Sequence, residues 1–120
     1  MKTILLIEDN EDILQNLIEY FELEGYKILS SNNGKDGLAL ASKNIPDLII
    51  CDVLMNEMNG YEVLRLLLDS ISTREIPFIF SSSNSELVDR AEALALGAND
   101  YIIKPFALNE LLQMAKKWTR

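Results

Sequence analysis

The chain has no histidine and only one cysteine, Cys51. Without histidine, a His-based catalytic triad and a His-ligated zinc site are both excluded. A single cysteine excludes an internal disulfide bond and is typical of a protein from a reducing compartment. Because Cys51 lies inside an apolar run, we interpret it as a packed thiol rather than a reactive group.

Long hydrophobic runs are lacking as well. No apolar stretch approaches the roughly 20 residues that a membrane-spanning helix needs. The first residues, Met1-Lys2-Thr3, lead directly into a strand-like run, with no signal peptide before it. We therefore expect a cytoplasmic protein that has no membrane partner.

Basic residues are scarce beside acidic ones: 11 Lys and Arg stand against 19 Asp and Glu, for a formal net charge of -8. This balance argues against direct nucleic-acid binding, which normally needs a basic surface, and against anionic membranes. It fits an acidic metal site and a basic protein partner, although an ordinary polar surface explains most of it. The 120 residues, 48% of them hydrophobic, predict one domain over residues 1–120 with one core.

Short apolar runs alternate with amphipathic stretches along the chain. The runs predict five strands, at residues 3–7, 26–30, 48–51, 78–81 and 101–103. Strands that are apolar on both faces are typical of a parallel sheet covered by helices on both sides. The predicted fold class is therefore α/β, a flavodoxin-like (βα)5 three-layer sandwich whose central parallel five-stranded sheet has the order 2-1-3-4-5.

Capping residues predict where the intervening helices begin and end. Asn10 and Asn59 are expected N-caps, and Gly25 a left-handed C-cap. A turn is predicted at residues 33–34, followed by a short helix at 38–43. Residues 83–86 have capping-box spacing and predict a helix through residue 96. A last helix follows the fifth strand, with Ala107 at its N-cap.

Three of the predicted strands end in charged residues. Glu8-Asp9 follows the first strand, Asp52 ends the third, and Lys104 ends the fifth. The carboxyl ends of parallel strands meet at one edge, and the switch point of this strand order falls beside the first and third strands. Because close carboxylates repel one another unless a cation joins them, the sequence predicts a Mg²⁺ site at this edge.

The same edge carries groups suited to phosphoryl transfer. Asp52 is the candidate nucleophile, because a carboxylate that attacks phosphorus gives an acyl phosphate. Asp9 is the expected direct metal ligand, and Glu8 is expected to hold a metal-bound water. Lys104 and Ser82 would contact the phosphoryl oxygens, since such transfer depends on positioning and charge neutralisation.

Each of these residues has an ordinary structural explanation when taken alone. An Asp at a strand end is usually a loop or cap residue, a Ser in the run 81–83 is usually in a turn, and a single Lys is usually a surface residue. The set is much harder to explain in this way, because all of the groups are predicted to fall at one sheet edge.

Four stretches of the chain together resemble a known family. They are residues 7–10 (IEDN), 46–52 (PDLIICD), 58–62 (MNGYE) and 97–106 (GANDYIIKPF). With the spacings from Asp52 to Ser82 and from Ser82 to Lys104, they make the chain similar to a response-regulator receiver domain (CheY-like) of two-component phosphorelay systems. The resemblance covers essentially all 120 residues.

The resemblance implies a phosphorylation site that requires Mg²⁺. Asp52 would accept a phosphoryl group from a sensor histidine kinase or a His-phosphotransfer protein. Glu8, Asp9, Asp52 and the backbone carbonyl of Leu54 would form the metal site. Beyond its own aspartyl phosphorylation and dephosphorylation, such a domain is not expected to be an enzyme.

The resemblance also implies a conformational switch. Ser82 would be the switch hydroxyl, Ser83 would border the site, and Tyr101 would swing inward when Ser82 moves toward the phosphate. Lys104 would bind the phosphoryl group, and its peptide bond to Pro105 would be cis. The face formed by the fourth helix, fifth strand and fifth helix would then control an output protein or domain, with the receiver a monomer or a weak phosphorylation-dependent dimer.

Several positions depart from the pattern of the family. Asn56 stands where proline is common, and Ser82 replaces the commoner threonine but keeps the hydroxyl. Leu54 offers an apolar side chain to the pocket and cannot position an attacking water, so slow loss of phosphate is expected. Ala107 lacks a capping side chain, which costs about 1 kcal/mol relative to Ser or Asp.

Rival functions predict other features. A docking-only relative that is never phosphorylated is disfavoured by the complete set of Asp9, Asp52, Ser82 and Lys104. A Mg²⁺-dependent phosphotransferase or phosphatase would show Asp-x-Asp after the first strand and a substrate cap. A flavin-binding protein would need a hydroxyl- and glycine-rich loop there. The sequence leaves open whether the receiver stands alone or belongs to a longer regulator or hybrid kinase.

Overall fold

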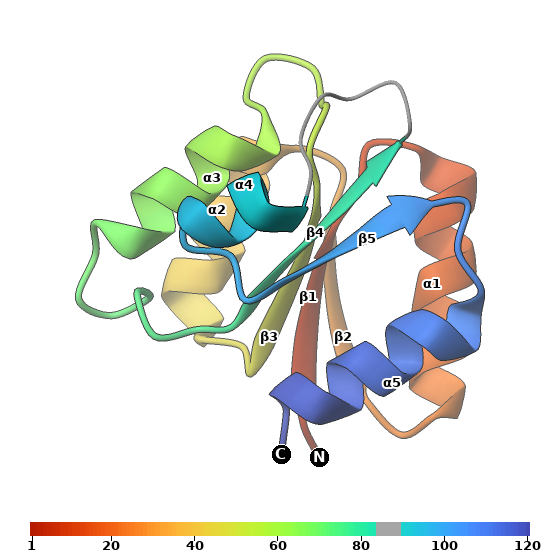
Figure 1. Cartoon of the computed structure of the whole chain (residues 1–120). Coiled ribbons are helices and arrows are strands. Elements are labelled where there is room, and N and C mark those ends of the chain that lie inside the picture. Colours follow the sequence, from red (N-terminus) through yellow and green to blue (C-terminus); the bar gives the residue numbers. More distant parts are fainter. Residues whose placement is uncertain (84–89) are drawn as a thin grey trace.

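Five parallel strands form the centre of the molecule, and helices cover both faces of the sheet (Figure 1). The computed structural model describes residues 1–83 and 90–120. The elements are β1 (Thr3–Ile7), α1 (Glu11–Leu23), β2 (Lys27–Ser31), α2 (Gly34–Asn44), β3 (Leu48–Asp52), α3 (Gly60–Leu68), β4 (Phe78–Ser83), α4 (Arg90–Ala95), β5 (Asp100–Lys104) and α5 (Leu108–Trp118). The strand order is β2-β1-β3-β4-β5, which confirms the predicted fold class and sheet order.

Alternate residues of each strand contribute to two separate layers of core. On one face, Ile49 and Phe80 pack with side chains from α2, α3 and α4. On the other face, Ile50 and Ile79 pack with side chains from α1 and α5. We call these the α2–α4 face and the α1–α5 face. The alternation explains why the sequence shows continuous apolar runs, since both faces of the sheet are buried.

Side-chain caps fix the beginnings of three helices at the residues that follow the strands. Asn10 and Asn59 are N-caps as predicted, and Asn59 forms a full capping box with Glu62. After α1, Gly25 has a φ of 95°, as expected for a left-handed residue beyond the helix end. These caps hold the first turns of α1 and α3 beside the carboxyl ends of β1 and β3.

The predicted turn at residues 33–34 is wrong. Asn33 is instead the N-cap of α2, because its side chain accepts a hydrogen bond from the backbone N–H of Asp36, and the helix starts at Gly34. The sequence suggested a turn because the first residues of α2 include Gly34 and Gly37 and show no apolar stripe. Gly37 lies against Ile7 of β1, where a Cβ would come within 2.5 Å of the Ile7 Cδ1.

The second half of the chain agrees with the expectations in part. The predicted capping box at 83–86 lies largely outside the described residues, and α4 is described from Arg90 to Ala95. Strand β4 continues to Ser83, two residues beyond its predicted end. Ala107 is the N-cap of α5 and makes no side-chain cap hydrogen bond, as predicted.

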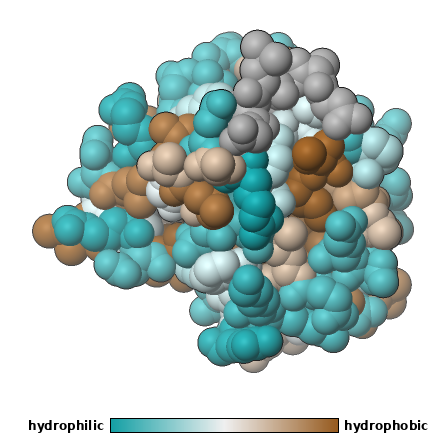
Figure 2. All heavy atoms as spheres, viewed as in Figure 1, coloured by the Kyte–Doolittle hydropathy of each residue, from teal (hydrophilic) through white to brown (hydrophobic). Residues whose placement is uncertain are grey.

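Exposed leucines gather on the surface of α3 and α4. Leu66 and Leu68 are each 37% exposed, whereas Leu67 between them is buried. Leu94 and Leu96, at the end of α4, are more exposed than either. Figure 2 shows brown, hydrophobic atoms over the region of α3 and α4.

Candidate functional site

The carboxylates of Glu8, Asp9 and Asp52 meet at the carboxyl end of β1 and β3. One carboxylate oxygen from each lies within 4.8 Å of the others. Glu8 and Asp52 are only 3% and 5% exposed, while Asp9 is open to solvent. A cluster of hard oxygen ligands, buried on one side and open on the other, is chemically suited to Mg²⁺ with part of its water shell.

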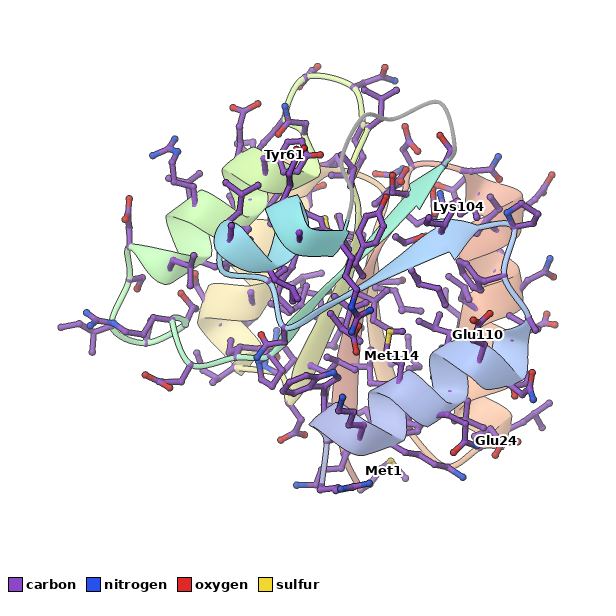
Figure 3. All side chains as sticks on the ribbon, in the orientation of Figure 1. Met1, Glu24, Tyr61, Lys104, Glu110 and Met114 are labelled. Carbon is purple, nitrogen blue, oxygen red and sulfur yellow. The ribbon has the colours of Figure 1, made fainter. Side chains whose placement is uncertain are left out.

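Lys104 reaches this cluster from the end of β5. Its Nζ lies 2.8 Å from Oε1 of Glu8 and 3.2 Å from Oδ1 of Asp52. Figure 3 shows Lys104 beside the arrowheads of β4 and β5. The other Glu8 oxygen accepts a hydrogen bond from the backbone N–H of Asn10, the N-cap of α1. Lys104 therefore bridges two carboxylates that come from different strands.

Burial and charge act in opposite directions on Lys104. Burial by itself lowers the pKa of the ammonium group, but the hydrogen bonds and negative charges of Glu8 and Asp52 outweigh burial and raise the pKa above its usual value. For Cys51, burial raises the pKa of the thiol, and the charges of Asp52 and Glu8 raise it further. The thiol is thus held neutral, in agreement with a packed cysteine.

Gly60 allows α3 to start directly against the end of β3. A Cβ at this position would collide with the backbone carbonyl oxygen of Asp52. The Gly60 N–H donates to the carbonyl of Val53 at 2.7 Å, which ties the helix start to the loop after Asp52. The sequence showed Asn59-Gly60 as part of a motif, but the need for glycine becomes clear only from this close approach.

The three serines at the end of β4 are strand residues. The ordinary expectation of a turn is wrong here, because Ser82 pairs with Ile103 and Ser83 pairs with Lys104 of β5. Ser82 is completely buried, and its Oγ donates to the carbonyl of Ser83 at 3.2 Å. Tyr101 is also buried, at 6% exposed, within the core of the α2–α4 face. The structure thus places the two predicted switch residues on neighbouring strands.

The remaining predicted site residues lie in the loops beside the cluster. The Lys104–Pro105 peptide bond is cis. Leu54, two residues after Asp52, is 64% exposed. Its side chain is therefore largely open to solvent beside the carboxylates.

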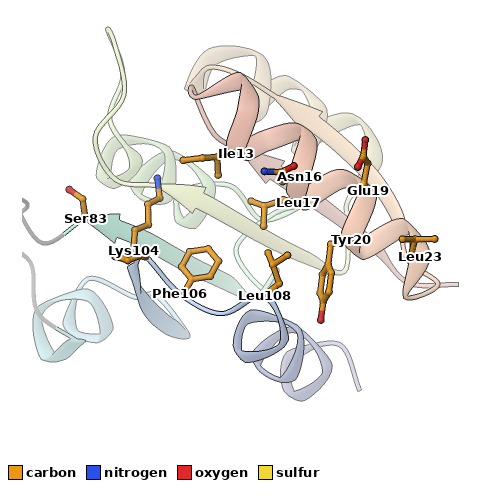
Figure 4. Close-up of a pocket in the computed structure, with 11 residues that line it drawn as sticks. Ile13, Asn16, Leu17, Glu19, Tyr20, Leu23, Ser83, Lys104, Phe106 and Leu108 are labelled. Carbon is orange, nitrogen blue, oxygen red and sulfur yellow. The ribbon is translucent and has the colours of Figure 1, made fainter.

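An apolar groove adjoins Lys104. It has a volume of about 750 Å³ and lies between α1 and the segment that leads from β5 into α5. In Figure 4, Leu17 and Tyr20 of α1 lie on one side of the groove and Phe106 and Leu108 on the other. Lys104, which lines the groove, also contacts the buried carboxylates of Glu8 and Asp52.

The fold and the site together define a class of protein. The family model "Response regulator receiver domain" matches residues 4–116. The chain therefore belongs to the receiver-domain family of two-component response regulators. Response regulator SaeR of Staphylococcus aureus is 37% identical over 112 residues, which are 93% of this chain and 48% of that protein. The chain thus spans about half the length of this curated relative.

Solved receiver domains have the same architecture. The receiver domain of a signal transduction histidine kinase from Syntrophus aciditrophicus is 34% identical, with a TM-score of 0.90 over 99% of this chain and 90% of that chain. The receiver domain of sensor histidine kinase PA1611 from Pseudomonas aeruginosa PAO1 is 27% identical, with a TM-score of 0.84 over 98% and 97% of the two chains. That structure has a magnesium ion coordinated in its active site cleft.

Within residues 1–83 and 90–120, none of the helices has both the length and the apolar character needed to cross a bilayer.

Proposed function

We propose that this receiver domain accepts a phosphoryl group on Asp52 in a Mg²⁺-dependent reaction. The observation that carries the proposal is the meeting of Glu8, Asp9 and Asp52 within 4.8 Å, with Lys104 bound to two of them. Magnesium in the site of PA1611 supports the same assignment for the carboxylates here. When bound, Mg²⁺ would neutralise charge on the carboxylates and on the phosphoryl oxygens.

The site residues have different roles in the phosphoryl transfer. A carboxylate oxygen of Asp52 forms a bond to phosphorus, the bond from phosphorus to the donor breaks, and the donor leaves with the electron pair. Lys104 moves from Asp52 to the incoming phosphoryl oxygens, over a distance that its flexible side chain can cover. Glu8 keeps its contact with Lys104 or would hold a water of the metal, and Asp9 and Asp52 would hold the metal itself.

The phosphoryl group then biases the loop at the end of β4. It adds a charge of about −1.5 to −2 and three strong acceptor oxygens. Ser82 gains a hydrogen bond by turning toward these oxygens, and Tyr101 responds from the neighbouring strand, two residues before Ile103, which is the residue paired with Ser82. The surface of α4, β5 and α5 thereby reports the phosphorylation state.

The expected partners follow from this chemistry. The donor is a sensor histidine kinase or a His-phosphotransfer protein, and the apolar groove beside Lys104 offers it a surface next to Asp52. The output is a protein or domain that binds the switching surface, in the cytoplasm. The domain has no outside substrate to turn over and catalyses only its own phosphorylation and dephosphorylation.

The direct test is incubation with acetyl phosphate and Mg²⁺, followed by intact mass measurement. We expect one labile phosphoryl adduct in the wild type and none in Asp52→Asn or in the presence of EDTA. Asp69→Asn is a matched control, since Asp69 is 69% exposed and far along α3 from the site. No adduct, with Mg²⁺ binding shown separately by calorimetry, would favour a docking-only domain instead.

A further inference from the structure

Ser81 lies beside Asp52 and has no role in the site as described so far. It is the residue of β4 in register with Asp52 of β3. Ile50 and Ile79 both belong to the core of the α1–α5 face, so Asp52 and Ser81, each two residues further on, point to that same face. Neighbouring strands are about 4.8 Å apart, which brings the two side chains within contact of each other.

The hydroxyl of Ser81 is buried without a partner. Ser81 is 5% exposed, and within residues 1–83 and 90–120 its Oγ makes no hydrogen bond. Two other buried hydroxyls are satisfied: Thr73 donates to the carbonyl of Leu67 at 2.7 Å, and Thr119 to that of Ala115 at 2.8 Å. An unsatisfied buried hydroxyl is destabilising, so an alanine or valine at this position would suit the resting protein better.

The contact between Lys104 and Asp52 accounts for the unused hydroxyl of Ser81. Ile102 belongs to the core of the α1–α5 face, so Lys104 points to the same face as Ser81 and Asp52. Its Nζ must cross β4 to reach Asp52 on β3, because β4 lies between β5 and β3. In this structure Lys104, rather than Ser81, supplies the side-chain hydrogen bond to Oδ1 of Asp52.

We propose that Ser81 is a positioning residue of the phosphorylation site, whose hydroxyl donates to the carboxylate of Asp52 once Lys104 has turned to the phosphoryl group. The inference rests on the proposed function and extends it. When Lys104 leaves, the oxygen of Asp52 that does not bind phosphorus loses a donor; it would also be held by the metal, but it keeps a second acceptor position that Ser81 can reach by a rotation about its χ1. Ser82, the next residue, points to the opposite face and has a different role.

Two variants of equal shape isolate the hydroxyl. Ser81→Thr keeps it, whereas Ser81→Val replaces it with a methyl group. The probe is the beryllium trifluoride anion, which coordinates a carboxylate oxygen and presents fluorides where phosphoryl oxygens would lie. We would titrate it into each protein in saturating Mg²⁺ by calorimetry, and measure Mg²⁺ binding alone and urea unfolding without either ligand.

The expected pattern separates positioning from a merely structural role. Ser81→Val should bind beryllium trifluoride about tenfold more weakly than Ser81→Thr, because a hydrogen bond to a charged group is lost. Ser81→Thr should stay near the wild type, and Mg²⁺ affinity should be the same in all three. Without ligands, Ser81→Val should be at least as stable as Ser81→Thr. If Ser81→Val fails to fold, Ser81→Ala against the wild type gives the same comparison.

Two results would overturn the inference while leaving the proposed function intact. One is equal fluoride affinity in Ser81→Val and Ser81→Thr. The other is a ligand-free Ser81→Val that is clearly less stable than Ser81→Thr, since the hydroxyl would then already have a partner at rest. Failure of the wild type to bind the fluoride or to form an acetyl phosphate adduct would overturn both proposals.

Discussion

Buried carboxylates lie near both ends of strand β5, and they differ in their hydrogen-bond and ion-pair partners. At its start, Oδ1 of Asp100 lies 2.7 Å from Arg90 and accepts the backbone N–H of Tyr101, while Oδ2 accepts the indole N–H of Trp118 at 2.9 Å. At its end, Lys104 contacts both Glu8 and Asp52. The first carboxylate has several donors, whereas at the other end two carboxylates share one ammonium group.

The difference separates a structural pair from a site that is prepared for a ligand. The charge of Asp100 is matched by Arg90, and its carboxylate also accepts hydrogen bonds from the Tyr101 N–H and the Trp118 indole N–H. At the other end, Asp9 adds a third negative charge beside the ammonium group of Lys104, which Glu8 and Asp52 share. Close carboxylates in excess favour the entry of a cation. The comparison predicts that similar substitutions will have unlike effects at the two ends.

The largest difference is expected from Asp→Asn at the two positions. In metal-free buffer, Asp100→Asn should lower the free energy of unfolding by about 2 kcal/mol, because the buried acceptor of Arg90 and Trp118 loses its charge. Asp52→Asn should raise it by about 1 kcal/mol, because it relieves repulsion from Glu8 and Asp9 while Lys104 keeps Glu8. Urea unfolding followed by circular dichroism measures both.

Asp69→Asn is the control for these measurements. Its pair with Arg65 spans 3.8 Å between two side chains that are 66% and 69% exposed, so the change should stay within about 0.5 kcal/mol. If Asp52→Asn lowered the free energy of unfolding as much as Asp100→Asn, the negative charges of the carboxylate site would already be compensated without a metal. That result would contradict the comparison.

Addition of Mg²⁺ should stabilise the protein through the carboxylates beside Lys104 and not through Asp100. At a free concentration of 100 times Kd, the wild type should gain about 2.7 kcal/mol. Asp100→Asn should gain the same amount from its lower starting point, and Asp52→Asn should gain much less. Shifts of the urea midpoint with and without EDTA give these values. Equal gains in Asp52→Asn and the wild type would remove Asp52 from the metal site.

Lys104→Met removes the ammonium group and leaves a side chain of similar length. In metal-free buffer near neutral pH, we expect a loss of about 2 kcal/mol, since both carboxylates lose a charged donor. The pKa of Lys104 is raised, so its contribution is complete below the ordinary lysine pKa of about 10.4 and disappears as the pH rises through the higher folded value.

The stability difference between the wild type and Lys104→Met should therefore be constant from about pH 7 to pH 10 and shrink above about pH 10.4. Urea unfolding across this range tests the point, and the difference between the two proteins cancels the titration of other groups. A difference that already declines below pH 9 would mean that the carboxylates do not hold the proton on Lys104.

The smallest effect concerns α5, which runs from beside Lys104 to Trp118 near Asp100. Its N-cap, Ala107, makes no side-chain hydrogen bond. Ala107→Ser should raise the free energy of unfolding by about 1 kcal/mol, because a hydroxyl can accept one of the free backbone N–H groups. The change should leave Mg²⁺ affinity unaltered. Altered Mg²⁺ affinity would show that the order of α5 reaches the site through Pro105 and Phe106.

The sequence predicted the sheet and the site for physical reasons. Strands buried on both faces leave continuous apolar runs, and polar residues at their ends mark the edge where they meet. These two features place Glu8, Asp52 and Lys104 at one sheet edge from the sequence alone. The two caps at Asn10 and Asn59 were equally readable, because capping depends on a few neighbouring residues.

Features that depend on contacts between distant residues could not be predicted. Helix α2 begins at Gly34, against α3, where a longer apolar residue would not fit, so the usual stripe was missing. The pairing of Asp100 with Trp118 and Arg90 joins three elements that show no common motif. Ser81 was predicted as the end of the fourth strand, but its position beside Asp52 could not be predicted, because it is set by the register of β3 and β4.

The most direct test of the central claim is to locate the phosphoryl group. After incubation with acetyl phosphate and Mg²⁺, borohydride converts an aspartyl phosphate to homoserine, which peptide mass spectrometry detects at a defined residue. We predict homoserine at position 52 alone, and none when EDTA is present. Homoserine at Asp9 or Asp100, or its absence in a protein that binds Mg²⁺, would contradict the assignment of Asp52 as the phosphoryl acceptor.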